Sequence, residues 1–175
     1  MAFWNLSTLE PKRKHRWLLY LNNSKIPSYA VKVTDKPSFT INETEHNFFG
    51  HKFYYPGQVA WNEISVTLVD PIHDDTSKAL LTVLENSGYQ PPTEHENDML
   101  NTVSKADSVK ALGPTIKLEQ VTGVDQKNKV VEEWELHNPW IKEVKFGDLD
   151  YASDDMVEIT LSIRYDWATY LSKRP

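Results

Sequence analysis

Two histidines in the first third of the chain are of the residue type that binds metals. His46 and His51 lie near Glu43 and Glu45, in a stretch rich in phenylalanine and tyrosine. Their His-x4-His spacing fits no zinc signature, and a hairpin that turns through glycine and phenylalanine is a poor ligand scaffold. We therefore interpret both histidines as surface residues.

Acidic residues form two further groups with possible chemistry. His73, Asp74 and Asp75 could ligate a divalent cation through oxygen atoms, but the same aspartates are explained as the N-cap of the helix that follows. The other group is Asp148, Asp150, Asp154 and Asp155. Paired carboxylates hydrolyse glycosides when a fold holds them at a fixed separation. These four lie in turn-like sequence beside glycine and serine, which favours a turn role.

Four tryptophans could form a platform for stacking sugars: Trp61, Trp134, Trp140 and Trp167. Large aromatic side chains more often fill a sheet core or an oligomer interface. Since each cluster has a sufficient structural explanation, we predict that the protein is not an enzyme and has no cofactor or metal. A carbohydrate-binding or glycoside-cleaving β-sandwich stays as an alternative of a different class.

The composition of the chain narrows the classes of protein that remain possible. The 175 residues are most simply one domain, and the absence of cysteine excludes disulfides and thiolate chemistry. The net charge of −6 argues against broad affinity for nucleic acid, because binding the phosphate backbone needs a positive surface. No signal peptide or apolar run of membrane-spanning length is present, so we expect no membrane segment.

The last third of the chain predicts four strands, at 115–122, 130–136, 140–151 and 156–167. In the last of these, Val157, Ile159, Leu161, Ile163 and Tyr165 alternate with polar residues. This period of two places the apolar side chains on one face of a strand. The first two segments form a hairpin around a polar turn at 125–128, and Gly147 indicates a bulge or bend in the third.

The first half of the chain begins with a basic arm at 1–16. We favour a solvated arm, with binding to an acidic partner as the alternative. Short strands are predicted at 17–21, 29–34, 38–42 and 61–70. Between them, 43–58 predicts a long hairpin with an aromatic-rich return strand, followed by a turn at Pro56-Gly57.

Two helices are predicted between the strands. One begins after the cap residues Asp74-Asp75-Thr76, carries an apolar stripe from Leu80 to Leu84, and ends at Ser87-Gly88. Residues 93–98 follow as an acidic surface loop. A shorter helix candidate covers 104–112, before Gly113-Pro114.

The order of these parts resembles that of the tail tube proteins of contractile-tailed bacteriophages, the T4-like group in particular. Residues 36–41 lead through the long hairpin to 61–68, and the capped helix follows. The segment EWELHNPW at 133–140 ends a hairpin, and GDLDY at 147–151 precedes the terminal strand. The resemblance covers residues 17–167 and leaves out the arm at 1–16, so we divide the chain into that arm and a β domain at 17–175.

The resemblance implies a mainly β fold: two antiparallel sheets packed as a barrel-like sandwich with one flanking α-helix, closing into a ring on hexamerisation. Stacked rings would form a tail tube through which DNA passes into the host. The partners implied are further copies of the chain, the tail sheath, the baseplate hub and the tape-measure protein, in a virion tail assembled in the host cytoplasm. Alternatives of the same kind are a baseplate-proximal tube initiator and the tube of a secretion or injection system.

Two sets of residues are candidates for roles in such a tube. Exposed aromatics of the long hairpin would contact the next subunit or ring: Phe48, Phe49, Phe53, Tyr54 and Tyr55. Polar residues opposite the apolar strand faces, or beside strand ends, would line the lumen: Glu133, Glu135, Asp148, Asp150, Glu158 and Thr160. A negative or neutral wall would let DNA, which carries about one charge per 1.7 Å, pass without binding.

Overall fold

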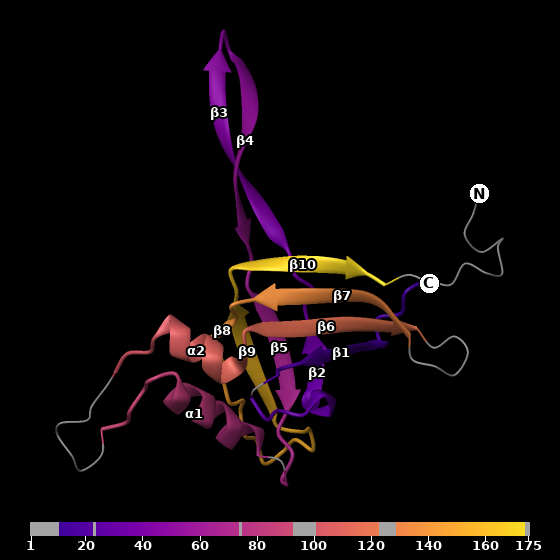
Figure 1. The fold of residues 1–175 in the computed structure, drawn as a ribbon, viewed down its shortest axis with the longest axis vertical. Helices are drawn as coiled ribbons and strands as arrows, with labels where there is room; N and C mark the ends of the chain where they lie inside the picture. The colour runs from indigo at the N-terminus through magenta and orange to yellow at the C-terminus, as the bar shows by residue number, and fades with distance from the viewer. Residues whose placement is uncertain (1–10, 23, 74, 93–100, 123–128, 174–175) are drawn as a thin grey trace.

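The computed structural model describes residues 11–22, 24–73, 75–92, 101–122 and 129–173. Within these residues, strands form two four-stranded antiparallel sheets and a separate two-stranded hairpin (Figure 1). The predicted mainly β fold with two antiparallel sheets is confirmed. The predicted turn at 125–128, the predicted loop at 93–98 and Asp74 lie outside the described residues.

The first sheet, here the A sheet, has the strand order β1-β6-β7-β10. Its strands are β1 (Trp17–Tyr20), β6 (Thr115–Thr122), β7 (Lys129–His137) and β10 (Trp167–Ser172). Ile116 and Leu118 of β6 and Leu136 of β7 are buried and alternate with more polar residues. This alternation gives the sheet one core face and one outer face.

The second sheet, here the B sheet, has the order β2-β5-β9-β8. Its strands are β2 (Val31–Thr34), β5 (Ile64–Val69), β9 (Glu158–Arg164) and β8 (Trp140–Lys145). Val66 pairs with Leu161 and Leu68 with Ile159 in the register of β5 and β9. All four of these side chains are 0% exposed.

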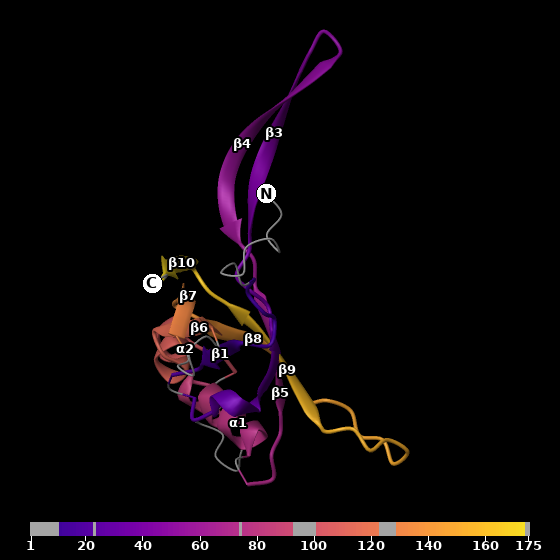
Figure 2. The same ribbon diagram turned by 90° about the vertical axis from the view of Figure 1, so that its right-hand side faces the viewer.

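The core lies between the two sheets, which form two layers whose strands cross (Figures 1 and 2). The predicted apolar face of the terminal strand is confirmed for Ile159, Leu161, Ile163 and Tyr165, which are all buried. Val157 is an exception, because it precedes β9 and is exposed.

Two helices flank the sandwich, beside each other at one side of it (Figure 1). Helix α1 (Thr76–Asn86) begins at Asp75, whose carboxylate accepts a 2.8 Å bond from the Lys78 backbone N–H, as the cap prediction requires. Helix α2 (Lys105–Leu112) begins at Ser104, which caps the Asp107 N–H in the same way. Among the described residues, no helix is long and apolar enough to cross a membrane.

One strand prediction and one turn prediction in the first half are wrong in detail. The predicted strand at 29–34 begins as a short 3-10 turn, η2 (Ser28–Ala30), before β2.

Pro56-Gly57 is not a turn, because β4 (His51–Trp61) runs through it and pairs with β3 (Phe39–Phe48). The register shifts opposite this pair, and a Cβ on Gly57 would lie 3.0 Å from the Asn42 carbonyl oxygen. Glycine therefore allows the close backbone approach at this bulge.

The predicted strand at 140–151 ends early, as β8 at Lys145. Gly147 has a positive φ of 83°, and a Cβ there would lie 2.4 Å from the Glu158 carbonyl oxygen. The chain therefore bends at Gly147, as the glycine indicated, but no strand resumes at 149–151. Residues 146–157 form a loop that extends away from the sandwich (Figure 2).

The terminal strand is two strands rather than one. β9 ends at Arg164 in the B sheet, and β10 starts at Trp167 in the A sheet. At the corner between them, the Asp166 backbone N–H donates to the His137 carbonyl, and its carboxylate accepts from Lys105 and Asn138. Neither glycine nor proline marks this corner, so the alternating pattern predicted one continuous strand across it.

Candidate assembly surfaces

The β3–β4 hairpin projects from the sandwich, and nearly all of its residues are exposed (Figure 1). Near the tip, Thr44 pairs with Tyr55, His46 with Phe53 and Phe48 with His51. Because side chains alternate along strands, these pairs share one face, which we call the aromatic face. The opposite face has the pairs Glu43–Pro56, Glu45–Tyr54 and Asn47–Lys52, with a 3.0 Å ion pair between Lys52 and Glu45.

The structure thus brings three of the five interface candidates together. Phe48, Phe53 and Tyr55 lie on the aromatic face and are 57%, 47% and 57% exposed. Tyr54 lies on the opposite face. Phe49 is in the turn, with a φ of 51° and its ring centroid 4.5 Å from that of Phe48.

Aromatic contacts anchor the base of the hairpin to the core. The ring centroids of Phe39 and Trp61 lie 5.5 Å apart, and those of Trp61 and Tyr165 lie 6.1 Å apart. Since Tyr165 is buried, this chain of rings connects the hairpin base to the sandwich. The tip is therefore exposed while the base is fixed.

The lumen candidates do not share one surface. Glu133 and Glu135 lie on the outer face of the A sheet, Glu158 and Thr160 lie on the outer face of the B sheet, and the two sheets face opposite ways (Figure 2). Asp148 and Asp150 lie in the loop after β8.

Glu133 is enclosed by lysines of its own chain. Its carboxylate pairs with Lys173 and, at 3.0 Å, with Lys117, and its side chain is 2% exposed. Hydrogen bonds from Lys173 and Lys117 lower the pKa of Glu133, although burial opposes them. Lys117 also pairs with Glu135 at 2.8 Å. These carboxylates are therefore neutralised within the subunit.

The outer face of the B sheet is mostly polar, and most of its charges are paired. Lys32 pairs with Glu158, Lys142 with Glu63 at 2.7 Å, and Lys145 with Glu143 at 3.3 Å. Hydroxyl side chains lie among these ion pairs: Ser65, Thr67, Thr160 and Ser162. The face is close to neutral.

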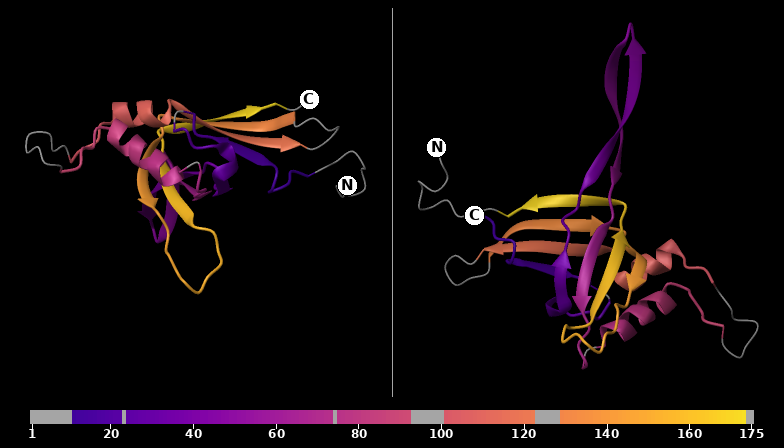
Figure 3. Two further views of the ribbon diagram at one scale, coloured as in Figure 1. Left: turned by 90° about the horizontal axis from the view of Figure 1, so that it is seen from below. Right: turned by 180° about the vertical axis from the view of Figure 1, so that it is seen from behind.

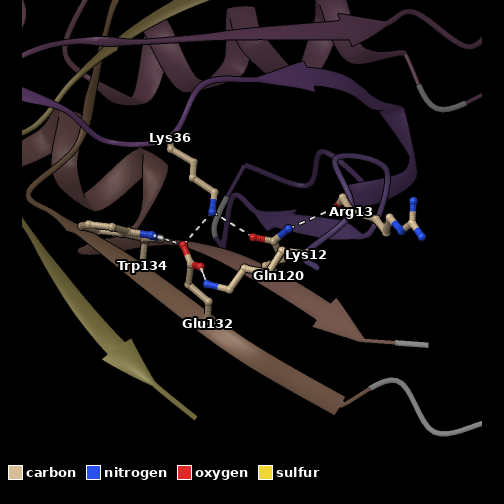
Figure 4. A network of polar contacts seen from close by, with 6 residues as sticks. All are labelled: Lys12, Arg13, Lys36, Gln120, Glu132 and Trp134. Atoms are coloured by element: carbon tan, nitrogen blue, oxygen red, sulfur yellow. Dashed lines mark hydrogen bonds and ion pairs between the residues drawn. The ribbon is translucent and has the colours of Figure 1, made fainter. Parts of the chain in front are cut away.

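A polar network centred on Glu132 lies where the basic arm meets the A sheet (Figure 4). The Glu132 carboxylate accepts from Lys12, from the Lys36 Nζ at 2.6 Å and from the Trp134 Nε1 at 2.6 Å. Lys36 also donates to Gln120, whose amide donates to the Arg13 carbonyl. Residues 12 and 13 of the arm are therefore held against the sheet by an acidic partner within the chain.

Sequence reasoning selected Glu133 and Glu135 and missed Glu132. Glu132 alternates with Trp134 and Leu136, so the period of two already places it on the core face. A carboxylate on a core face needs charged or hydrogen-bonding partners. That requirement was the signal for a contact with the basic arm.

The Glu132 network is expected to make stability depend on pH. Burial raises the pKa of Glu132, but the bonds from Lys12, Lys36 and Trp134 outweigh burial and lower it from 4.5 to about 2. A carboxylate with a lowered pKa in the folded state stabilises it above the ordinary value, and the contribution is lost as pH falls toward 2. Urea unfolding of the wild type and of Glu132→Gln is expected to differ most above pH 4.5. A difference that stayed constant down to pH 2 would contradict this.

The clusters with possible chemistry stay apart or have structural roles. His46 and His51 pair with phenylalanines rather than with each other, and the described residues contain no group of three or more potential metal ligands. In the loop after β8, Asp150 accepts from the Ala152 N–H and Asp155 from the Ser153 hydroxyl, as expected of turn residues.

The four tryptophans form no single platform. Trp134 packs against the core, and Trp167 stacks on His137 on the outer face of the A sheet. Trp61 and Trp140 line the same cavity of about 630 Å³, which also includes Arg164 and Asp166.

Taken together, the crossed sheets, the flanking helices and the projecting hairpin define a fold that solved contractile injection particles also contain. No protein-family model and no curated protein matches the sequence. A chain in the anti-feeding prophage baseplate structure is similar, with a TM-score of 0.66, 17% identity, and coverage of 93% of this chain and 97% of that one.

Two further structures contain similar chains. One is the anti-feeding prophage tube-terminating cap, with a TM-score of 0.60, 13% identity, and coverage of 98% and 99% of the two chains. The other is the PVC sheath-tube complex of an extracellular contractile injection system in the extended state, with a TM-score of 0.58, 15% identity, and coverage of 98% and 99%. At these identities, the similarity establishes the fold.

Proposed function

We propose that this protein is a structural, non-enzymatic subunit of the tube of a contractile tail or injection particle. The observation that carries the proposal is the fold similarity to chains from tube-cap and sheath-tube structures, which extends over 98% of the sequence. Six copies would form a ring, and rings would stack into a tube. The sixfold symmetry of the similar baseplate structure supports this number.

Free strand edges in the subunit support ring formation. In the described part of the chain, β2 and β8 are the edge strands of the B sheet and pair on one side only. Exposed edges favour pairing with other chains unless something covers them. A ring in which neighbouring copies meet at these edges leaves no edge of the B sheet open. The aromatic face of the hairpin would then contact the next ring.

We assign the outer face of the B sheet to the lumen, with Glu158 and Thr160 on it. Its paired charges and hydroxyl groups would give a potential close to neutral, so that DNA or a protein cargo does not adhere. Glu133 and Glu135, which pair with lysines of their own chain, are placed away from the lumen. Asp148 and Asp150 lie in the loop at the end of this sheet.

In a phage, the tube would lie inside the tail sheath, join the baseplate hub and enclose the tape-measure protein before DNA passes. The protein would then be part of the virion tail, assembled in the host cytoplasm. The similarity to a baseplate chain favours a second assignment, a ring at the baseplate end of the tube. The tube of a secretion or injection system is a third assignment of the same kind.

Purified protein is expected to form rings or tubes visible by negative-stain electron microscopy, with a matching large species in size-exclusion chromatography. Long stacks would identify a tube body, and single rings would identify a terminal ring. A monomer at all concentrations would contradict the proposed function. If that monomer bound glycans through the cavity at Trp61 and Trp140, the carbohydrate-binding alternative would hold.

A further inference from the structure

A cleft with a basic rim lies beside the free edge of β2. Its volume is about 630 Å³, and the consecutive residues 32–36 form one wall. Apolar surface opposite this wall comes from Trp17, Leu118 and Trp134. Two lysines of the basic arm, Lys12 and Lys14, also line the cleft. A wall made of consecutive residues of an edge strand is suited to an extended peptide, which can add to the sheet edge.

The charges in the cleft favour an acidic ligand. Four lysines line it, but Lys12 and Lys36 share Glu132 and Lys32 pairs with Glu158. With Asp35 as the other carboxylate, the excess is a single positive charge. The cleft therefore offers apolar surface together with an excess of positive charge. Its complement is an extended segment in which acidic and apolar side chains alternate.

The loop 146–157 has that pattern. Leu149 and Tyr151 are 86% and 112% exposed, so neither contributes to the core. They alternate with Asp148 and Asp150, and two further aspartates follow in the loop. Gly147 determines where the loop leaves β8, because its positive φ and its contact with the Glu158 backbone exclude a side chain.

The loop extends away from its own cleft. It lies on the side of the B sheet that faces away from the A sheet, whereas Leu118 and Trp134 of the A sheet form part of the cleft (Figures 2 and 3). The donor and the acceptor are thus different surfaces of one molecule. Contacts between two such surfaces are heterologous, and they close into rings when the rotation between copies allows it.

We propose that the loop 146–157 of one copy docks in the β2 cleft of a second copy. Leu149 and Tyr151 contact the apolar surface of Trp17 and Trp134, and the aspartates face the lysines. The occupant is a second copy of this chain because the acidic, alternating segment is present in the sequence itself. This inference rests on the proposed assembly and specifies one of its contacts.

Engineered disulfides test the contact directly, because the chain has no cysteine of its own. Tyr151→Cys and Lys14→Cys proteins are mixed under assembly conditions and oxidised. Both positions are exposed, so both variants are expected to fold. A disulfide needs Cα atoms within about 7 Å. We expect a covalent dimer from this mixture and a loss of that product when Ile72→Cys, at a position 96% exposed outside the cleft, replaces Lys14→Cys.

A second pair of variants tests the charges. Asp148→Lys combined with Asp150→Lys is expected to cause a loss of rings in sedimentation velocity, and the addition of Lys14→Glu is expected to restore part of them. Rings without the specific crosslink would overturn the loop contact and leave the proposed function intact. A crosslink without rings would support the contact and contradict the tube. If neither formed, both would fail.

Discussion

A variant that lacks residues 45–51 is expected to fold normally and to form no long tubes. In this variant Thr44 still faces Tyr55, and residues 52–54 become the new hairpin loop. The deleted segment is exposed throughout and lies beyond the aromatic anchor at Phe39 and Trp61. Shortening a loop changes its closure entropy only slowly, so the monomer loses little stability. Tube length by electron microscopy and thermal unfolding measure the two effects.

Two point variants serve as matched controls for this deletion. Phe53→Ser removes an aromatic side chain from the aromatic face and is expected to shorten the tubes. Lys52→Gln removes the ion pair on the opposite face and is expected to leave them unchanged, because exposed ion pairs contribute little. Normal tubes from the deletion variant would exclude the hairpin as the stacking element. A lower unfolding temperature would place it in the core.

Leu161→Ala is expected to lower the free energy of unfolding by about 2–5 kcal/mol, as deletion of a fully buried leucine side chain does elsewhere. Leu161 is 0% exposed and faces Val66 and Val144 on the neighbouring strands. The surrounding sheet cannot collapse fully into the cavity, so packing is lost together with burial. Urea denaturation of the assembly-deficient hairpin variant measures the effect in a monomer.

Ile72→Ala is the control for this core substitution. Ile72 is 96% exposed, and its truncation is expected to change the free energy of unfolding by less than about 0.5 kcal/mol. Equal effects at the two positions would contradict the assignment of the core between the sheets.

The sequence predicted best where a local pattern and tertiary packing agree. The alternation at 157–165 located the buried face of β9, and Asp75 located the start of α1. Tertiary structure decided the remaining details. Tyr165 and Asp166 have no turn signature, yet the chain moves from one sheet to the other there, held by Lys105 and Asn138. Pro56 lies within a strand because a two-stranded hairpin has free edges that do not need its missing N–H.

Prediction of the candidate surfaces from the sequence was limited in the same way. Alternation placed Glu133 opposite the apolar face correctly, but could not predict that Lys117 and Lys173 enclose it. It also could not predict that β7 and β9 lie in different sheets with outer faces turned apart. Long-range pairing determines which polar faces combine into one surface, and a local pattern carries no information on that pairing.

The continuity of the hairpin with the B sheet has a mechanical consequence. Strand β2 leads into β3, and β4 leads into β5, so a pull on the hairpin tip acts on β2 and β5 together, along their length. Such a force loads the six residue pairs between β5 and β9 in shear, all at once, rather than opening them one after another. The hairpin can therefore transmit axial tension to the sandwich without peeling a strand from it.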